Sequence, residues 1–442
     1  SKINRTSLSH MLRFKRLNKN RSEVLVMSQD NSILSLLNIK DENIEISQVE
    51  NQIRYVGGEK RIIKVLHGRL TYRLTRCPQC GFRSIVKNGT RLTKLRVTSL
   101  TGQETRLHLR KQRYLCRNCG QTCGAHTPIV TPNHSITNQV RIRINELARN
   151  SLTAEMIAKL VGVSPTSVQR TIYTGRKAFL EHRRLPKILC FDEFRSVHST
   201  FSFICIDAQT HNLVTLLPDR LTKHIVDYFL NQYSLAERQA VEAVTMDLNA
   251  QYQHFIHRIF PNAEIIIDRF HIVQLAGRAL DQARLAILHE LSDHRCRHYK
   301  MLKSQWRLFH RNESQLNSQR RQFKRGLNEY LTDQEVVDTI TDQFPDFKRV
   351  YTSYQTILHA IQEGDTAALK ALINHYQPIQ SEMDTVISTF RKNWQGIKNA
   401  CCYQYSNGPL EGIIRKIKQL KRGCFGFKNL AHLFIRIKLI HA

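Results

Sequence analysis

The sequence lacks the features that would assign this protein to a membrane or to the cell exterior. Its 442 residues contain no run of about 18 apolar residues, the length that a membrane-spanning helix requires. The first residues lack the apolar segment of a secretory signal peptide. No fixed-period repeat or low-complexity tract is found either. We therefore expect a cytoplasmic protein with no membrane partner.

Acidic residues are also scarce. The chain has 36 Asp and Glu against 67 Lys and Arg, which gives a formal net charge of +31 at pH 7. Such an excess repels itself unless a polyanion neutralises it, so nucleic acid is the leading candidate partner. A ribosome-associated protein or a merely basic surface is the alternative. Residues 1–26 carry seven Lys and Arg with a single acid, Glu23, and are expected to form a basic arm.

Two Cys-x-x-Cys pairs stand out among the 11 cysteines. In a cytoplasmic chain such pairs favour metal ligation over disulfides. Cys77 with Cys80 and Cys116 with Cys119 suit a tetrahedral four-cysteine zinc site, and the alternating residues between them predict a zinc ribbon with a long hairpin. A redox pair and plain buried cysteines are the alternatives. Cys123 or His126 could replace one ligand.

Residues 152–173 have the pattern of a helix-turn-helix. Ala158 is small where two helices would cross, Gly162 allows a left-handed turn, and Ser164 followed by Pro165 suits the start of a second helix. An ordinary helical hairpin is the alternative. The outward face of the second helix, where a recognition helix meets the DNA major groove, would then carry Thr166, Ser167, Gln169 and Arg170.

Two acids follow short apolar runs farther along the chain. Asp192 ends the run Ile188 to Phe191, and Asp247 ends the run Val241 to Met246. A carboxylate at the end of a buried strand needs a positive partner, either a basic side chain or a divalent metal ion. The order of elements is that of an RNase H-like fold, in which the first and fourth strands are neighbours. The expected strands are 187–194, 201–208, 212–217, 241–246 and 263–267, with helices at 222–233 and 252–260.

Residues 272–400 have a nearly continuous helical pattern, in which Phe347 to Ile361 trace one apolar helix face. A further helix is expected after Asn407-Gly408-Pro409, with Glu411 in its first turn. This acid could simply complement the helix dipole.

These motifs in this order resemble bacterial insertion-sequence transposases of the DDE class, most closely the ISL-three family. The resemblance rests on the paired Cys knuckles, FDEF, TMDLNAQY, IIDRFHIV and SNGPLEGIIRKIK, and runs from about Met27 to the end of the sequence. It implies that Asp192, Asp247 and Glu411 are the three catalytic acids and hold two Mg²⁺ or Mn²⁺ ions. Asp268 would be structural, pairing with Arg269 or a backbone amide.

The resemblance also implies an activity, partners and a location. We expect a DNA transposase of the bacterial nucleoid that binds terminal inverted repeats and catalyses strand cleavage and strand transfer. Its partner would be double-stranded DNA, and cutting two ends together would require a homodimer or larger assembly. From their positions near Glu411, Arg415 and Lys418 could hold the scissile strand.

The expected fold class is α+β multidomain, with an RNase H-like core interrupted by a long helical insertion. A non-catalytic DNA-binding regulator and a structure-specific nuclease on the same fold are the alternative functions. The expected domains are the basic arm and N-terminal segment (1–50), the zinc ribbon (51–130), the helix-turn-helix (131–185), the first part of the core (186–271), the insertion (272–400) and the C-terminal core helices (401–442).

Overall fold

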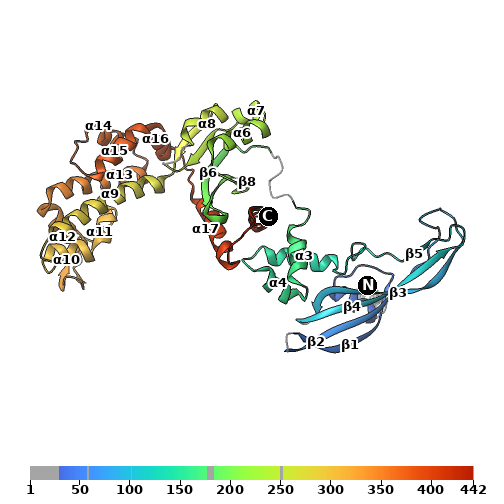
Figure 1. The fold of residues 1–442 in the computed structure, drawn as a ribbon. Helices are drawn as coiled ribbons and strands as arrows, with labels where there is room; N and C mark the ends of the chain where they lie inside the picture. Colours follow the sequence, from blue (N-terminus) through green and yellow to red (C-terminus); the bar gives the residue numbers. More distant parts are fainter. Residues whose placement is uncertain (1–28, 57–58, 101, 177–183, 249–251, 442) are drawn as a thin grey trace, which may run out of the picture.

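The computed structural model describes residues 29–56, 59–100, 102–176, 184–248 and 252–441. Figure 1 shows an N-terminal sheet, a group of short helices, a central sheet and a helical lobe that follow one another across the view. The basic arm expected at 1–26 and residues 249–251 of the TMDLNAQY stretch lie outside the described residues. Within the described part of the chain, no helix is both long and apolar enough to cross a membrane.

The N-terminal sheet is built on strand β4, whose side chains alternate between its two faces. Leu107 and Leu109 are fully buried, and Arg106 and His108 beside them are half-buried. Strand β4 pairs antiparallel with β3 and parallel with β2, while β1 lies outside β2. The expected hairpin between the cysteine pairs is therefore β3–β4. The elements are α2 (Gln29–Leu36), β1 (Ile44–Val56), β2 (Glu59–Leu70), β3 (Ile85–Leu100), β4 (Gln103–Cys116) and β5 (Thr122–Gly124).

Three short helices follow, and the second and third each begin with a side-chain cap. The Thr153 side chain accepts a hydrogen bond from the N–H of Met156 and caps α4, and Ser164 caps α5 in the same way. Gly162 ends α4 with φ of 73°, as the sequence predicted for this turn. Ala158 and Val168 are buried between the helices. The three helices are α3 (Asn138–Ala148), α4 (Ala154–Val161) and α5 (Pro165–Tyr173).

The central sheet has the strand order β10-β9-β6-β7-β8. Strands β6, β7 and β8 pair antiparallel, whereas β9 and β10 run parallel to β6. The first and fourth strands of the segment are thus neighbours, as predicted. Its elements are β6 (Ile188–Arg195), η1 (Val197–Ser199), β7 (Phe201–Asp207), β8 (Leu213–Leu217), α6 (Thr222–Gln232), α7 (Leu235–Gln239), β9 (Ala243–Met246), α8 (Gln253–Ile259) and β10 (Glu264–Ile267).

The helical lobe begins with α9, a helix that starts directly after β10 and leaves the sheet. The lobe is not purely helical, because it contains a short hairpin of strands β11 and β12. The apolar residues from Phe347 to Ile361 form one buried face of α13, as expected. The lobe consists of α9 (Arg269–Glu290), α10 (Arg297–Ser304), α11 (Trp306–His310), η2 (Glu313–Gln315), β11 (Gln322–Lys324), β12 (Glu329–Leu331), α12 (Asp333–Gln343), α13 (Pro345–Glu363), α14 (Thr366–His375), α15 (Glu382–Lys392) and α16 (Trp394–Cys402).

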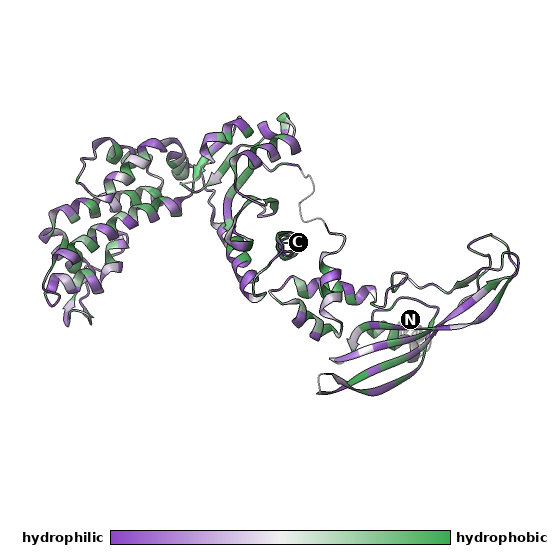
Figure 2. Cartoon of the chain, in the orientation of Figure 1, coloured by the Kyte–Doolittle hydropathy of each residue, from purple (hydrophilic) through white to green (hydrophobic). Residues whose placement is uncertain are grey.

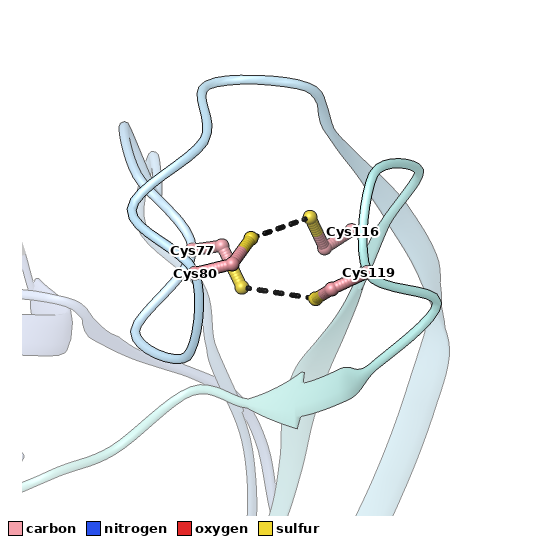
Figure 3. A group of neighbouring side chains, drawn as sticks. All are labelled: Cys77, Cys80, Cys116 and Cys119. Carbon is pink, nitrogen blue, oxygen red and sulfur yellow. Dashed lines mark hydrogen bonds between the residues drawn. The ribbon is translucent and has the colours of Figure 1, made fainter.

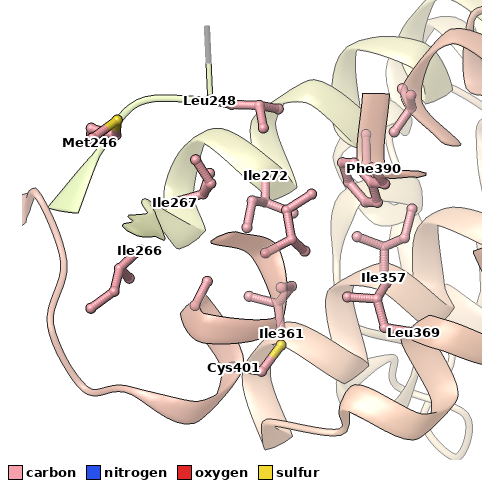
Figure 4. Packing of buried hydrophobic residues seen from close by; sticks show 14 of the residues in the cluster. Met246, Leu248, Ile266, Ile267, Ile272, Ile357, Ile361, Leu369, Phe390 and Cys401 are labelled. Atoms are coloured by element: carbon pink, nitrogen blue, oxygen red, sulfur yellow. The ribbon is translucent and has the colours of Figure 1, made fainter. Parts of the chain in front are cut away.

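The lobe and the central sheet share one hydrophobic core. Figure 4 shows Ile267 of the sheet and Ile272 of α9 near Ile361 of α13 and Cys401 of α16. These residues belong to one contiguous buried cluster. The boundaries expected at 271/272 and 400/401 fall within α9 and α16. The lobe therefore packs as a continuation of the sheet.

Two C-terminal helices cover the other face of the central sheet. Helix α17 (Gly408–Gly423) has an apolar side, including Leu410 and Ile417, that packs against Cys190 and Phe194 of β6. Figure 2 shows its opposite side as hydrophilic. Helix α18 (Leu430–His441) then runs back toward α3 and α5. As a result, the end of the chain contacts both the sheet and the three short helices.

Candidate metal centre and active site

The four expected zinc ligands lie together where two turns face each other (Figure 3). Cys77 Sγ is 3.7 Å from Cys119 Sγ, and Cys80 Sγ is 3.6 Å from Cys116 Sγ. Each turn closes through a glycine with positive φ, Gly81 donating to the Cys77 carbonyl and Gly120 donating to the Cys116 carbonyl. This four-cysteine cluster supports a structural zinc ion.

The two spare ligands considered for this centre lie elsewhere. Cys123 is on β5 and packs against the apolar core of the N-terminal sheet. His126 is exposed, and its backbone N–H donates to the Tyr72 hydroxyl. Among the described residues, the cysteine metal cluster contains neither of them. A hydrogen bond from the backbone N–H of Phe82 lowers the pKa of the Cys80 thiol to about 6.

Asp192 lies within β6 and Asp247 directly follows β9, at the same level of these two adjacent parallel strands. Strands β6 and β9 pair up to Cys190 opposite Thr245, and each acid lies two residues beyond its strand's last paired position. Side chains two residues apart in a strand share a face, so Asp192 lies on the same face as Cys190, which packs under α17. Burial and the neighbouring Asp247 charge raise the pKa of Asp192 to about 7.

The second acid of the FDEF stretch lies on the opposite face of β6. Glu193 accepts a hydrogen bond of 2.8 Å from the Tyr252 hydroxyl and forms an ion pair with Arg220. It is therefore satisfied within the protein. Because side chains alternate between the two faces of β6, Asp192 faces the other acids whereas Glu193 forms a structural ion pair.

Glu411 approaches the two aspartates through His271. His271 Nε2 lies 2.9 Å from Asp247 Oδ1 and 3.8 Å from Glu411 Oε1. The Asp247 carboxylate raises the pKa of His271 above its ordinary value. The structure thus brings all three predicted acids to one end of the sheet, with an imidazole between the second and the third.

Asp268 lies close to His271 and Glu411. It is buried, and its Oδ1 accepts a hydrogen bond of 3.0 Å from the backbone N–H of Asn407. Pairing with a backbone amide was one of the two expected contacts; the other candidate, Arg269, instead donates to the carbonyls of Ala400 and Tyr403. Ligand atoms of Asp268, His271 and Glu411 all lie within 4.8 Å of one another.

Asn407 is a structural determinant that the sequence reading missed. It is fully buried, its backbone binds Asp268, and its side-chain Nδ2 donates to the carbonyl of Phe191, the residue before Asp192. One asparagine therefore ties the start of α17 to both β6 and the β10–α9 junction. His271 was missed as well. The only signals for them were the runs DRFH and SNG, which gave motif similarity without a role.

The acid cluster contains oxygens with unmet bonding capacity. Among the described residues, Asp247 Oδ1 and Asp268 Oδ2 are buried side-chain atoms without a hydrogen-bond partner. For Asp247 Oδ1 the His271 contact is close in distance but lies outside hydrogen-bond geometry. Buried carboxylate oxygens crowded in this way match the hard oxygen ligands that Mg²⁺ or Mn²⁺ binds. The residues present therefore fit a divalent-metal site.

A small pocket of about 230 Å³ opens beside Asp247 and His271. Gln274 and Arg278, which follow His271 on one face of α9, line it as well. Helix α17 presents Arg415 and Lys418 one and two turns after Glu411, both exposed on the acid's own side of the helix. Basic groups thus border the acids on two elements.

The residues expected to contact DNA on α5 are mostly free for that role. Thr166, Gln169 and Arg170 are exposed, whereas Ser167 is half-buried and its Oγ lies 2.9 Å from the capping Ser164 Oγ. A polar pocket of about 540 Å³ lies beside the helix and is lined by Ser167, Arg170 and Arg141 among others.

The chain matches two family models and a known protein that spans most of its length. A family model of DDE transposases of the ISL3 group, described as "Transposase", matches residues 189–437, more than half of the chain. A second model, described as "zinc-finger of transposase IS204/IS1001/IS1096/IS1165", matches residues 73–119. The transposase for insertion sequence element IS1001 from Bordetella parapertussis is 23% identical over 378 residues, which span 83% of this chain and 89% of that protein.

Another relative shares only part of the chain. A protein of Lactococcus lactis subsp. lactis named as an ATP-dependent protease is 34% identical over 119 residues. The match spans 27% of this chain and 38% of that protein, so we draw no function from it.

Proposed function

The chain belongs to the ISL3 family of DDE transposases, and on this premise we propose that it binds the terminal inverted repeats of an insertion sequence and cuts and joins DNA there. The observation that carries the proposal is the convergence of Asp192, Asp247 and Glu411, from three separate parts of the chain, at one end of the central sheet. The strand order supports an RNase H-like core for this site.

The three acids are proposed to be the metal ligands. When bound, two Mg²⁺ or Mn²⁺ ions would activate the attacking oxygen and stabilise the leaving oxygen in an in-line displacement at phosphorus. Desolvation and the Asp247 charge raise the pKa of Asp192, and this supports the assignment because a divalent cation bound by the carboxylates would offset both effects. Asp268 accepts a hydrogen bond from the backbone N–H of Asn407, the residue before α17, and its carboxylate lies within 4.8 Å of the ligand atoms of His271 and Glu411.

The surrounding basic residues are proposed to bind the DNA strand. Arg415 and Lys418 lie on the Glu411 side of α17, and Arg278 lies at the pocket beside Asp247. Each can contact a phosphate and orient the scissile bond toward the acids. His271, held between Asp247 and Glu411, can donate a proton or a hydrogen bond to a phosphate oxygen.

Recognition of the repeats is assigned to the N-terminal half of the chain. We propose that α4 and α5 act as a helix-turn-helix, with Thr166, Ser167, Gln169 and Arg170 at the base edges. The zinc ribbon, with exposed Arg83, Lys87 and Arg91, would contact flanking phosphates. Pairing two ends would bring together a homodimer or larger assembly on nucleoid DNA.

The test is cleavage of a labelled duplex carrying the terminal repeat, with Mg²⁺ or Mn²⁺. Asp192→Asn, Asp247→Asn and Glu411→Gln should each abolish cleavage and leave repeat binding intact. Glu193→Gln is the matched control, since this acid lies on the opposite face of β6 and should leave cleavage within about threefold.

The outcomes separate the alternatives. A wild-type protein that binds the repeat without cutting it would be a DNA-binding regulator. A protein that cuts but never joins the freed 3′-OH to a second duplex would be a nuclease. Full cleavage by any one of the three acid variants would remove that residue from the site.

A further inference from the structure

Helix α18 belongs to two hydrophobic clusters at once. Leu433, Phe434 and Ile437 pack with α17 against the central sheet. Ile435 and Leu439, on another side of the same helix, pack with Ile144 of α3 and Val168 of α5. One short helix therefore fills part of the core beneath the acids and part of the core beneath the proposed DNA-reading helix.

A buried arginine lies at the centre of this junction. Arg436 is only 2% exposed, and its guanidinium donates to the carbonyls of Ala148, Asn150 and Leu152 at 3.0, 2.8 and 3.1 Å. Ala148 is the last residue of α3, so its carbonyl lies at the negative end of that helix dipole. A buried cation without these acceptors would be strongly unfavourable, so the contact admits little movement.

Two further contacts close the junction on either side of Arg436. A Cβ atom at Gly423 would lie 2.5 Å from the Ser151 carbonyl oxygen, so the last residue of α17 meets the α3–α4 loop without room for a side chain. The ring of His432 stacks on Tyr173 of α5, with centroids 3.8 Å apart and planes 5° from parallel. Both contacts add close packing between the C-terminal helices and the three short helices.

We propose that this junction sets the position of the cut relative to the recognised sequence, with Arg436 as its positioning residue. Helix α17 carries Glu411, and α18 joins it to α5, which carries the proposed reading residues. A fixed junction holds the recognised bases and the acids at one separation along the DNA. The polypeptide itself also links the two, from Tyr173 at the end of α5 to Ile188 at the start of β6. The inference rests on the proposed function.

The experiment compares Arg436→Met and His432→Ala with wild type. The first removes the donors to the three carbonyls, and the second removes only the ring stack, so it serves where the first fails to fold. Lys428→Ala is the control, because Lys428 lies exposed in the loop before α18 and its loss removes one positive charge. Repeat affinity and the cleaved bond, mapped to the nucleotide, are measured for each.

Wild type and Lys428→Ala should cut one bond. The two junction variants should bind the repeat within about threefold of wild type, because neither residue belongs to the proposed reading face of α5. At the wild-type bond they should lose about 10- to 100-fold in rate, as misplacement by about 1 Å predicts, with new cuts at neighbouring bonds. A folded Arg436→Met or His432→Ala protein that cuts the same bond at the same rate overturns the inference.

Hydrogen exchange provides a reading that needs no cleavage. Amides of α3 to α5 should exchange faster in Arg436→Met while the strands of the central sheet keep their protection. If wild type binds the repeat and never cuts, the proposed function fails, and this measurement still decides whether α18 couples the two parts. Unchanged exchange in α3 to α5 would show that Arg436 does not stabilise the contact between α18 and these helices.

Discussion

Asp192 has a raised pKa because its charged form is unfavourable in this site. It is half-buried beside Asp247, and desolvation together with the Asp247 charge raises its pKa to about 7 from an ordinary value of 3.8. Without a cation, the folded protein therefore keeps a proton on this carboxyl over a range where the unfolded chain has lost it. Its contribution to stability is present at low pH and is lost as pH rises through the folded pKa.

Asp192→Asn should consequently stabilise the metal-free protein more at pH 8 than at pH 5. We expect the difference in free energy of unfolding between variant and wild type to shift in favour of the variant by about 1–3 kcal/mol over this interval. Denaturant titrations without added divalent ions or chelator, which leave the zinc in place, measure it. Added Mg²⁺ should stabilise wild type and not the variant.

Asp227→Asn is the control for this experiment, because Asp227 is exposed on α6. It should show the wild-type dependence on pH. Equal stability differences for Asp192→Asn at both pH values would contradict the buried, crowded environment assigned to Asp192.

Substitution of Asn407 tests whether its hydrogen bonds to Asp268 and Phe191 maintain the geometry of the acids. Asn407→Ala removes the donor to the Phe191 carbonyl inside a fully buried site but keeps the backbone hydrogen bond to Asp268. Leaving that carbonyl unsatisfied should lower the free energy of unfolding by about 1–3 kcal/mol. Cleavage should fall while repeat binding stays. Ser406→Ala, which loses only a 3.4 Å contact from the Gly408 N–H, should change neither quantity appreciably.

The strands of the central sheet and the helix pair α4–α5 were predictable because their signals are local. The apolar runs before Asp192 and Asp247 are long enough to define strands, and the caps at Gly162 and Ser164 define a turn between helices. The β11–β12 hairpin was missed because its strands, Gln322–Lys324 and Glu329–Leu331, are too short to show an alternating pattern. The parallel pairing of β2 with β4 joins residues about 40 positions apart, which no local pattern specifies.

In the candidate site, too, some residues have local sequence signals and others are brought together only by the tertiary fold. The acids could be chosen because strand ends and motif order point to them. Asn407 and His271 could not, because an asparagine before a helix and a histidine within a helix have ordinary structural explanations. Only the tertiary fold brings Asn407 against Phe191 and Asp268, and His271 between Asp247 and Glu411.

The zinc ribbon is expected to depend on its metal. Cys77→Ser or Cys116→Ser should reduce zinc to well below one ion per chain, because each removes one of four ligands. The β3–β4 end of the sheet should become protease-sensitive while the central sheet stays protected. Zinc content by mass spectrometry and limited proteolysis check this. Cys123→Ser should retain full zinc, and a loss there would place Cys123 among the ligands.

Positive charge is spread along the chain, from the ribbon through α5 to α17, and this predicts how DNA binding responds to salt. Arg415→Ala should reduce the magnitude of the slope of log affinity against log salt by about 0.9, the value for one phosphate contact. The loss should be the same on any sequence. Arg170→Ala should instead reduce the preference for the terminal repeat. Binding titrations at several salt concentrations, on repeat and random duplexes, distinguish the two.

The separation of Glu411 from the other acids along the polypeptide has a consequence for biosynthesis. The proposed reading helix and both aspartates leave the ribosome well before α17 does, and domains fold in that order during translation. A nascent or prematurely terminated chain would therefore be unable to cut DNA, which protects the chromosome during synthesis. Fragments ending before α17 would also lack α18, whose Ile435 and Leu439 complete the core beneath α3 and α5. Such fragments should compete poorly for the repeats, so incomplete products would be weak inhibitors of the finished enzyme.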